Sequence, residues 1–207
     1  ELMYSMPKGL TAATGMDALT HAIESYITTG AWVMSDMFEL KAIEMIAQNL
    51  KAAVDNGKDV AAREAMSQAQ YIAGMGFSNV GLGIVHSMAH PLGAFYDTPH
   101  GVANALLLPY VMEYNAESPA APKYIHIAKA MGVDTTGMSE AEGVKAAIEA
   151  VKALSISINI PQKLHEINVK EEDIPALAVA AFNDVCTGGN PRPTSVADIE
   201  ALYHKAF

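Results

Sequence analysis

Apolar residues recur every three to four positions along most of the chain, which is the period of an amphipathic α-helix. In residues 16–27, for example, Leu19, Ile23 and Ile27 follow this spacing. The same pattern predicts further helices over 35–54, 60–77, 80–95, 100–116, 139–158, 172–186 and 194–207. Alternating runs typical of strands and repeats of fixed period do not occur. The sequence therefore predicts one all-α domain of about eight to ten helices over residues 1–207.

Several helix ends carry local signals. Ser35 and Asp36 are good N-cap residues for the second helix. Ser139 and Glu142 have the spacing of a capping box. Pro91 is expected to interrupt the helix over 80–95.

The composition limits what the chain can bind. Hydrophobic residues make up 51% of the sequence and the mean hydropathy is +0.16. Yet the longest apolar runs are too short to cross a bilayer, so no membrane partner is expected. The excess instead predicts surface that is covered by another domain or a subunit. A net charge of −10 argues against a basic face for nucleic acid or anionic lipid.

Two further features concern compartment and domain organisation. Cys186 is the only cysteine, which excludes an internal disulfide and a cysteine zinc cluster and fits a reducing, cytoplasmic setting. The N-terminal segment starts abruptly and without an initiator Met. Residues 1–8 are therefore expected to be the junction to an absent N-terminal domain.

Asp17 and His21 are spaced i, i+4 in the first helix, so their side chains share one face. This arrangement is half of a common metal clip. Glu24 and Thr28 continue the same face. For the pair alone, a solvated polar face with an incidental ion pair is the alternative.

Three of the seven histidines lie close together in sequence. His86 and His90 repeat the i, i+4 spacing, and His100 follows after turn-forming Pro and Gly residues. Burying several imidazoles in apolar surroundings costs free energy unless something satisfies them, and a divalent metal would do so. One Asp with histidines suits Fe²⁺ or Zn²⁺, for which Ni²⁺ or Co²⁺ could substitute. Spacing alone leaves open which of the three histidines would be ligands.

The glycines at 74, 76, 81 and 83 do not form a nucleotide-binding fingerprint. The pattern G-x-G-x-x-G fails at both starts, and no predicted strand precedes either. Close helix packing explains these glycines better.

Three longer stretches together resemble a known family, the iron-containing alcohol dehydrogenases. These are GLTAATGMDALTHAIESY (9–26), GFSNVGLGIVHSMAHPLGAFYDTPHGVANALLLPYVMEYN (76–115) and DVCTGGNPRP (184–193). The resemblance implies the dehydroquinate synthase-like fold, in which an N-terminal α/β domain binds NAD(H) and a helical C-terminal domain binds Fe²⁺. It covers essentially the whole chain, but only the helical half of the fold. The chain alone is then expected to bind metal without catalysing the reaction.

The resemblance also implies roles for particular residues. By motif position, Asp17, His21, His86 and His100 are expected to ligate the metal. His90 would lie beside the nicotinamide and substrate as a proton relay or positioning group. Pocket-lining positions match Phe77 and Cys186, and Leu10 falls in a loop expected to approach the cofactor.

Within the family, residues 30–54 and 201–207 are most similar to members that interconvert lactaldehyde and 1,2-propanediol. The expected activity is metal-assisted hydride transfer between NAD(H) and a small alcohol or aldehyde, in a homodimer. Another small-alcohol dehydrogenase of the family, loaded with iron or zinc, is the near alternative. A metal-binding helical module without catalysis, and a metal-dependent hydrolase or lyase, are alternatives of a different class.

Overall fold

The computed structural model describes residues 3–207, which form nine α-helices, four short 3₁₀ turns and no strand. The helices are α1 (Lys8–Ile27), α2 (Val33–Asp55), α3 (Val60–Val80), α4 (Ile84–Tyr96), α5 (His100–Asn115), α6 (Tyr124–Ala130), α7 (Glu140–Ser157), α8 (Ile174–Phe182) and α9 (Val196–Ala206). The expected all-α class is confirmed.

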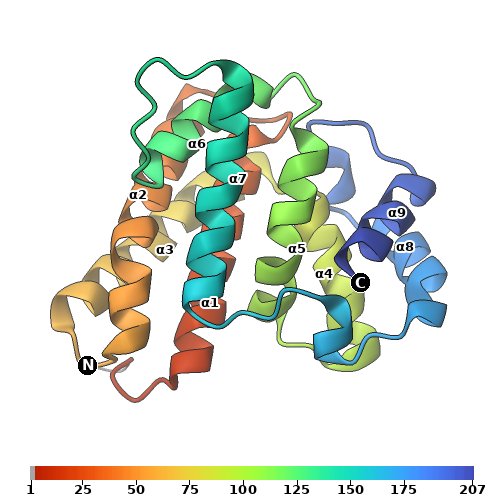
Figure 1. Ribbon diagram of the computed structural model, residues 1–207, viewed down its shortest axis with the longest axis horizontal. Helices are drawn as coiled ribbons and strands as arrows, with labels where there is room; N and C mark the ends of the chain where they lie inside the picture. The colour runs from red at the N-terminus through yellow and green to blue at the C-terminus, as the bar shows by residue number, and fades with distance from the viewer. Residues whose placement is uncertain (1–2) are drawn as a thin grey trace.

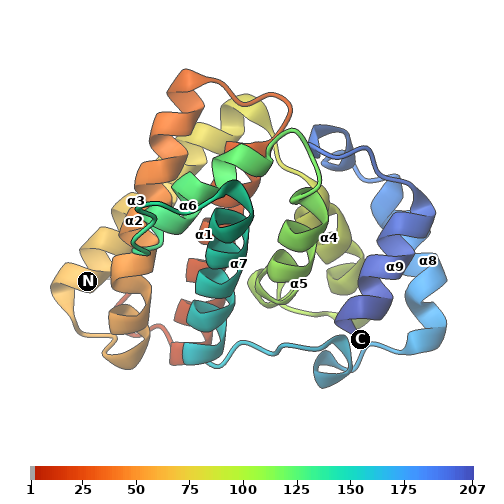
Figure 2. The same ribbon diagram turned by 45° about the horizontal axis from the view of Figure 1, so that its top comes forward.

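Helix α1 occupies the middle of the molecule (Figures 1 and 2). It packs against α2 and α3 on one side and against α5 on the other. Helix α4 packs on α5 and α8, α9 packs on α8, and α6 and α7 pack together beside α2. These contacts divide the helices into two groups, α1, α2, α3, α6 and α7 in one and α4, α5, α8 and α9 in the other. Residues on nearly every side of α1 are buried, which is typical of a helix inside the core rather than on its surface. The candidate chemistry on α1 and α4 lies where these two groups meet.

The capping signals agree with the structure in one place and fail in another. Ser139 accepts a hydrogen bond from the N–H of Glu142, so the predicted capping box of α7 is confirmed. The predicted start of α2 is wrong, because the helix begins at Val33. Ser35 lies in its first turn, where its hydroxyl accepts from the backbone N–H of Trp32.

Pro91 does not interrupt its helix, which corrects the expectation from sequence. Helix α4 continues through this proline to Tyr96. It ends at Asp97, whose φ of 52° is in the left-handed region and whose N–H reaches back to the carbonyl of Gly93. The chain then turns, and α5 begins at His100. The turn between the histidines is therefore at 97–99.

Only part of the glycine-rich stretch serves helix packing. A Cβ at Gly76 would lie 1.9 Å from the buried carboxylate of Glu39 on α2, so this position needs its glycine for packing. Gly81 has a φ of 81° and no neighbour within 4 Å of a Cβ. It is there because the chain needs a left-handed residue between α3 and α4.

Several large apolar side chains stay exposed, among them Trp32, Met37, Tyr71 and Val185. That another domain or subunit covers them stays a prediction. Within residues 3–207, no helix is both long and apolar enough to cross a bilayer. Of the proposed junction at 1–8, residues 1 and 2 lie outside the described residues.

Candidate metal centre

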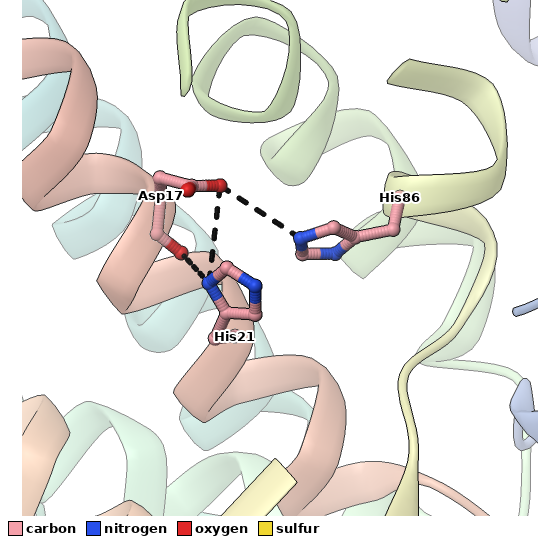
Figure 3. A group of neighbouring side chains, drawn as sticks. All are labelled: Asp17, His21 and His86. Atoms are coloured by element: carbon pink, nitrogen blue, oxygen red, sulfur yellow. Dashed lines mark hydrogen bonds and ion pairs between the residues drawn. The ribbon is translucent and has the colours of Figure 1, made fainter. Parts of the chain in front are cut away.

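Asp17 and His21 lie one turn apart in α1, and His86 points toward them from α4 (Figure 3). The Oδ1 atom of Asp17 is 3.7 Å from Nε2 of His86 and 3.8 Å from Nδ1 of His21. One potential ligand atom from each of these side chains lies within 4.8 Å of the others. Two helices that are far apart in sequence thus bring a carboxylate and two imidazoles to one point.

His100 joins this cluster from a third helix. Its Nε2 atom is 3.4 Å from Oδ1 of Asp17, and it is the first residue of α5. The next residue, Gly101, lets α5 begin against the backbone of α1, because a Cβ there would lie 2.3 Å from the carbonyl oxygen of Ala13. The structure therefore places Asp17, His21 and His86 in one group of ligand atoms, and His100 adjoins this group through its contact with Asp17. That these four residues ligate a metal stays a prediction.

Hydrogen bonds orient the ligand-type groups. Nδ1 of His21 lies 2.8 Å from the backbone carbonyl of Asp17. A carbonyl can only accept, so Nδ1 carries the proton and Nε2 keeps its lone pair. The side-chain amide of Asn104 donates to Oδ1 of Asp17 at 2.7 Å and faces Nε2 of His100 at 3.0 Å. Sequence reasoning missed Asn104, although it lies one turn after His100 on the same helix face.

His86 is buried and has a second carboxylate partner. Its Nδ1 atom lies 2.5 Å from Oε2 of Glu24, which is only 2% exposed. Its Nε2 atom is buried with no hydrogen-bond partner. Glu24, which continues the helix face of Asp17 and His21, is therefore buried rather than solvated. The only signal for this residue was its i+7 spacing from Asp17.

Burial favours the neutral form of two of the imidazoles. It lowers the pKa of His21, with a further lowering from the neighbouring His86. It also lowers the pKa of His100, although the Asp17 carboxylate opposes this shift. Neutral imidazoles offer the lone pairs that a cation needs.

His90 lies beside the cluster rather than within it. Its ring stacks on that of His100, with centroids 5.4 Å apart and an interplanar angle of 14°. Its Nδ1 atom lies 2.8 Å from Oδ2 of Asp184, so this carboxylate fixes the ring. The Nε2 atom is left as the one that could exchange a proton.

Phe77 lies against the cluster. Its ring stacks on that of His21, with centroids 4.5 Å apart. It also lines a cavity of ≈ 980 Å³ between α1 and α3, which Asp17 and His21 line as well. The structure thus offers a partly apolar space next to two of the ligand-type side chains.

Cys186 and Leu10 are not among the residues that line this cavity. The backbone N–H of Cys186 donates to Asp184, next to His90, and burial raises the pKa of its thiol to about 12. Leu10 is half exposed in the first turn of α1. The expectation that it lies in a loop is wrong, because the helix already begins at Lys8.

Comparison with known proteins agrees with this architecture. Residues 11–207 match the family model described as "Fe-containing alcohol dehydrogenase family, C-terminal". Lactaldehyde reductase of Escherichia coli K12 is 59% identical over 207 residues, which are 100% of this chain and 53% of the relative. A 1,3-propanediol dehydrogenase of Klebsiella pneumoniae is 47% identical over 206 residues, again 100% of this chain and 53% of the relative.

Solved structures show the same fold. A 1,3-propanediol oxidoreductase superposes with a TM-score of 0.98 at 47% identity, covering 100% of this chain and 54% of that one. An alcohol dehydrogenase from Oenococcus oeni gives a TM-score of 0.97 at 41% identity, with the same coverage. The chain belongs to the iron-containing alcohol dehydrogenase family and has the helical fold of its C-terminal domain. It spans about half the length of the curated relatives it matches.

Proposed function

We propose that this chain is the metal-binding half of an oxidoreductase that interconverts lactaldehyde and 1,2-propanediol with NAD(H). The 59% identity to a lactaldehyde reductase supports this substrate pair. The 47% identity to a 1,3-propanediol dehydrogenase supports small alcohols and diols as the wider class. Fe²⁺ is the proposed ion, and Zn²⁺ is the alternative.

One observation carries the proposal. Nε2 of His86 is buried without a hydrogen-bond partner and faces the carboxylate of Asp17 at 3.7 Å. A buried acceptor atom without a donor is costly unless something satisfies it, and a cation between it and the Asp17 carboxylate would do so. With His21 and His100 beside them, the donor set is one carboxylate and three imidazoles, which suits Fe²⁺ or Zn²⁺. These four residues would hold the metal.

When bound, the metal supplies Lewis acidity toward the substrate oxygen and the nicotinamide supplies the hydride chemistry. The chain's own residues would do the rest. Phe77 offers an apolar wall beside His21, which would help to exclude water from the reacting centre. His90, with Nδ1 held by Asp184, would give or take a proton at Nε2.

The remaining parts of the proposal concern the whole protein. NAD(H) would be held mainly by an N-terminal α/β domain, joined through residues 1–8. The relatives' greater length supports such a domain. The chain alone would bind metal without reducing lactaldehyde, and rapid NADH-dependent turnover by this chain would contradict that. A homodimer and a cytoplasmic location stay predictions.

Metal content tests the proposed centre. The chain is purified without air, and iron and zinc are measured by elemental analysis beside a His86→Ala, His100→Ala double variant. We expect an equimolar amount of metal in the wild type and its loss in the variant. Equal metal in both proteins, or none in the wild type, would reject the four-residue site.

A second experiment separates catalysis from metal binding alone. In the full-length enzyme, His90→Ala is expected to keep its metal and to lose about 10²- to 10⁴-fold in turnover, which is the usual contribution of a positioned acid or base. Unchanged turnover would remove His90 from the reaction. Activity that needs no nicotinamide would instead favour a metal-dependent hydrolase or lyase.

A further inference from the structure

The start of α4 is unusual because its capping group comes from another helix. Gly83, the N-cap residue, has no side chain to accept from the first turn. Glu24 of α1 takes this place, with Oε1 accepting from the N–H of Val85 at 2.7 Å and Oε2 from that of His86 at 3.4 Å. A carboxylate at a helix N-terminus is also favoured by the helix dipole.

The glycine at position 83 makes room for this contact. A Cβ there would lie 2.9 Å from Oε1 of Glu24 and 3.1 Å from Oδ1 of Asn190. A capping side chain at 83 and the buried carboxylate cannot both occupy this space. The local sequence of α4 is therefore suited to a cap supplied by α1.

The same carboxylate also reaches the ring of His86. Its Oε2 atom lies 2.5 Å from Nδ1. The carboxylate oxygens already accept from two backbone N–H groups, and with the carboxylate as acceptor the contact to the ring places the imidazole proton on Nδ1. The lone pair is then on Nε2, the buried atom that faces Asp17 without a hydrogen-bond partner.

We infer that Glu24 is a positioning residue for the metal centre. Its one carboxylate fixes the backbone, the ring orientation and the tautomer of His86, and it joins α1, which carries Asp17 and His21, to α4. Glu24 acts through His86 and does not itself ligate the metal. The inference rests on the proposed function, because it takes His86 to be a ligand.

Glu24→Gln is the sharpest test, because it keeps the shape and changes the donors. With its oxygen on Val85, the glutamine amide would point an N–H at Nδ1 and favour the wrong tautomer. If the amide is turned the other way, its NH₂ group faces the N–H of Val85, so that two donors meet. Either arrangement weakens the site. We expect Co²⁺ affinity, followed by its visible absorption, to fall about 10- to 100-fold.

Two controls make the result specific. Glu39→Gln alters another buried carboxyl group, whose partner is Ser25, and it should leave Co²⁺ affinity unchanged. Nitrogen-15 NMR of the metal-free wild type should show His86 protonated at Nδ1, a result that depends on no variant. In Glu24→Gln the proton should shift toward Nε2.

The outcomes separate this inference from the proposed function. A Glu24→Gln protein that is less stable but keeps its Co²⁺ affinity and tautomer would show that Glu24 is only a helix cap. A wild-type His86 protonated at Nε2 would overturn the inference even if the variant fails to fold. A wild-type chain that takes up no Co²⁺ would reject the proposed metal centre itself, and this inference with it.

Discussion

At the scale of single residues, Glu39 is a buried acid whose hydrogen-bond partner is the hydroxyl of Ser25. The Oγ atom of Ser25 lies 2.5 Å from the backbone carbonyl of His21 and 2.5 Å from Oε1 of Glu39. The hydroxyl donates to Glu39, and this hydrogen bond by itself lowers the pKa of the carboxyl group. Burial opposes this effect more strongly and, with a smaller contribution from the charge of nearby Asp36, raises the pKa of the carboxyl group to about 8, so Glu39 is mostly a neutral acid at pH 7.

This proton makes stability depend on pH. The ordinary pKa of Glu39 is 4.5, so between pH 4.5 and about 8 the folded chain keeps a proton that the unfolded chain has released. Its stability contribution is fully present below pH 4.5 and falls as pH rises to about 8, with a slope of up to about 1.4 kcal/mol per pH unit. Glu39→Gln stays neutral, so its stability relative to the wild type should rise between pH 5 and pH 8 in urea unfolding.

The Glu44→Gln change, at a half-exposed side chain on the same helix, is the control and should follow the wild type between pH 5 and pH 8. Parallel curves for Glu39→Gln and the wild type would mean that Glu39 is ionised in the folded chain.

Sequence could not distinguish the three acidic residues that matter here. Asp17, Glu24 and Glu39 all lie in helices with polar neighbours, and the helical period gives the face of each but not what covers it. Glu24 becomes a buried partner of His86 because the first turn of α4 lies against Glu24. The i, i+4 spacing of Asp17 and His21 was visible in the sequence because it is local.

At the scale of elements, the close approach of α5 to α1 depends on one glycine. Gly101→Ala would place a Cβ 2.3 Å from the backbone of Ala13, which cannot move without moving α1. We expect a loss of about 1–3 kcal/mol in the free energy of unfolding, as in other overpacked sites. Because His100 is the preceding residue, Co²⁺ affinity should fall too.

Gly74→Ala is the matched control. It lies inside α3 with no neighbour within 4 Å of a Cβ. Here alanine should stabilise the helix by about 0.5–1 kcal/mol, because it restricts the unfolded chain and favours the helix. If both variants lose stability equally in urea unfolding, contact between α1 and α5 is not the reason that position 101 is glycine.

The helix boundaries show which signals sequence can supply. The capping box of α7 was predictable because Ser139 and Glu142 satisfy each other within one turn. The short α6 has only seven residues, which is too few for a periodic pattern to define. Pro91 fails to break α4 because tertiary contacts hold the helix on α5 and α8.

At the scale of the whole molecule, the proposed ligands lie on both sides of the contact between the two helix groups. Asp17 and His21 come from α1, His86 from α4 and His100 from α5. The resemblance to the family could supply this set from motif positions. Spacing alone could not supply it, since spacing makes His90 as good a candidate ligand as His86 and His100. Only the fold shows that the Nδ1 atom of His90 is turned to Asp184.

A metal shared by three helices should stabilise the whole chain. The unfolded chain does not hold these four side chains together, so binding adds to folding stability, by about 4 kcal/mol at a free metal concentration a thousandfold above Kd. For a chain of this size the Tm should rise by about 10 °C.

Thermal unfolding, followed by circular dichroism with Zn²⁺ and then with EDTA in excess, measures this rise in Tm. His100→Ala should lose most of the increase, whereas His204→Ala, exposed on α9, should keep it. An equal rise in both variants would mean that the ion binds elsewhere and that α5 takes no part in the site.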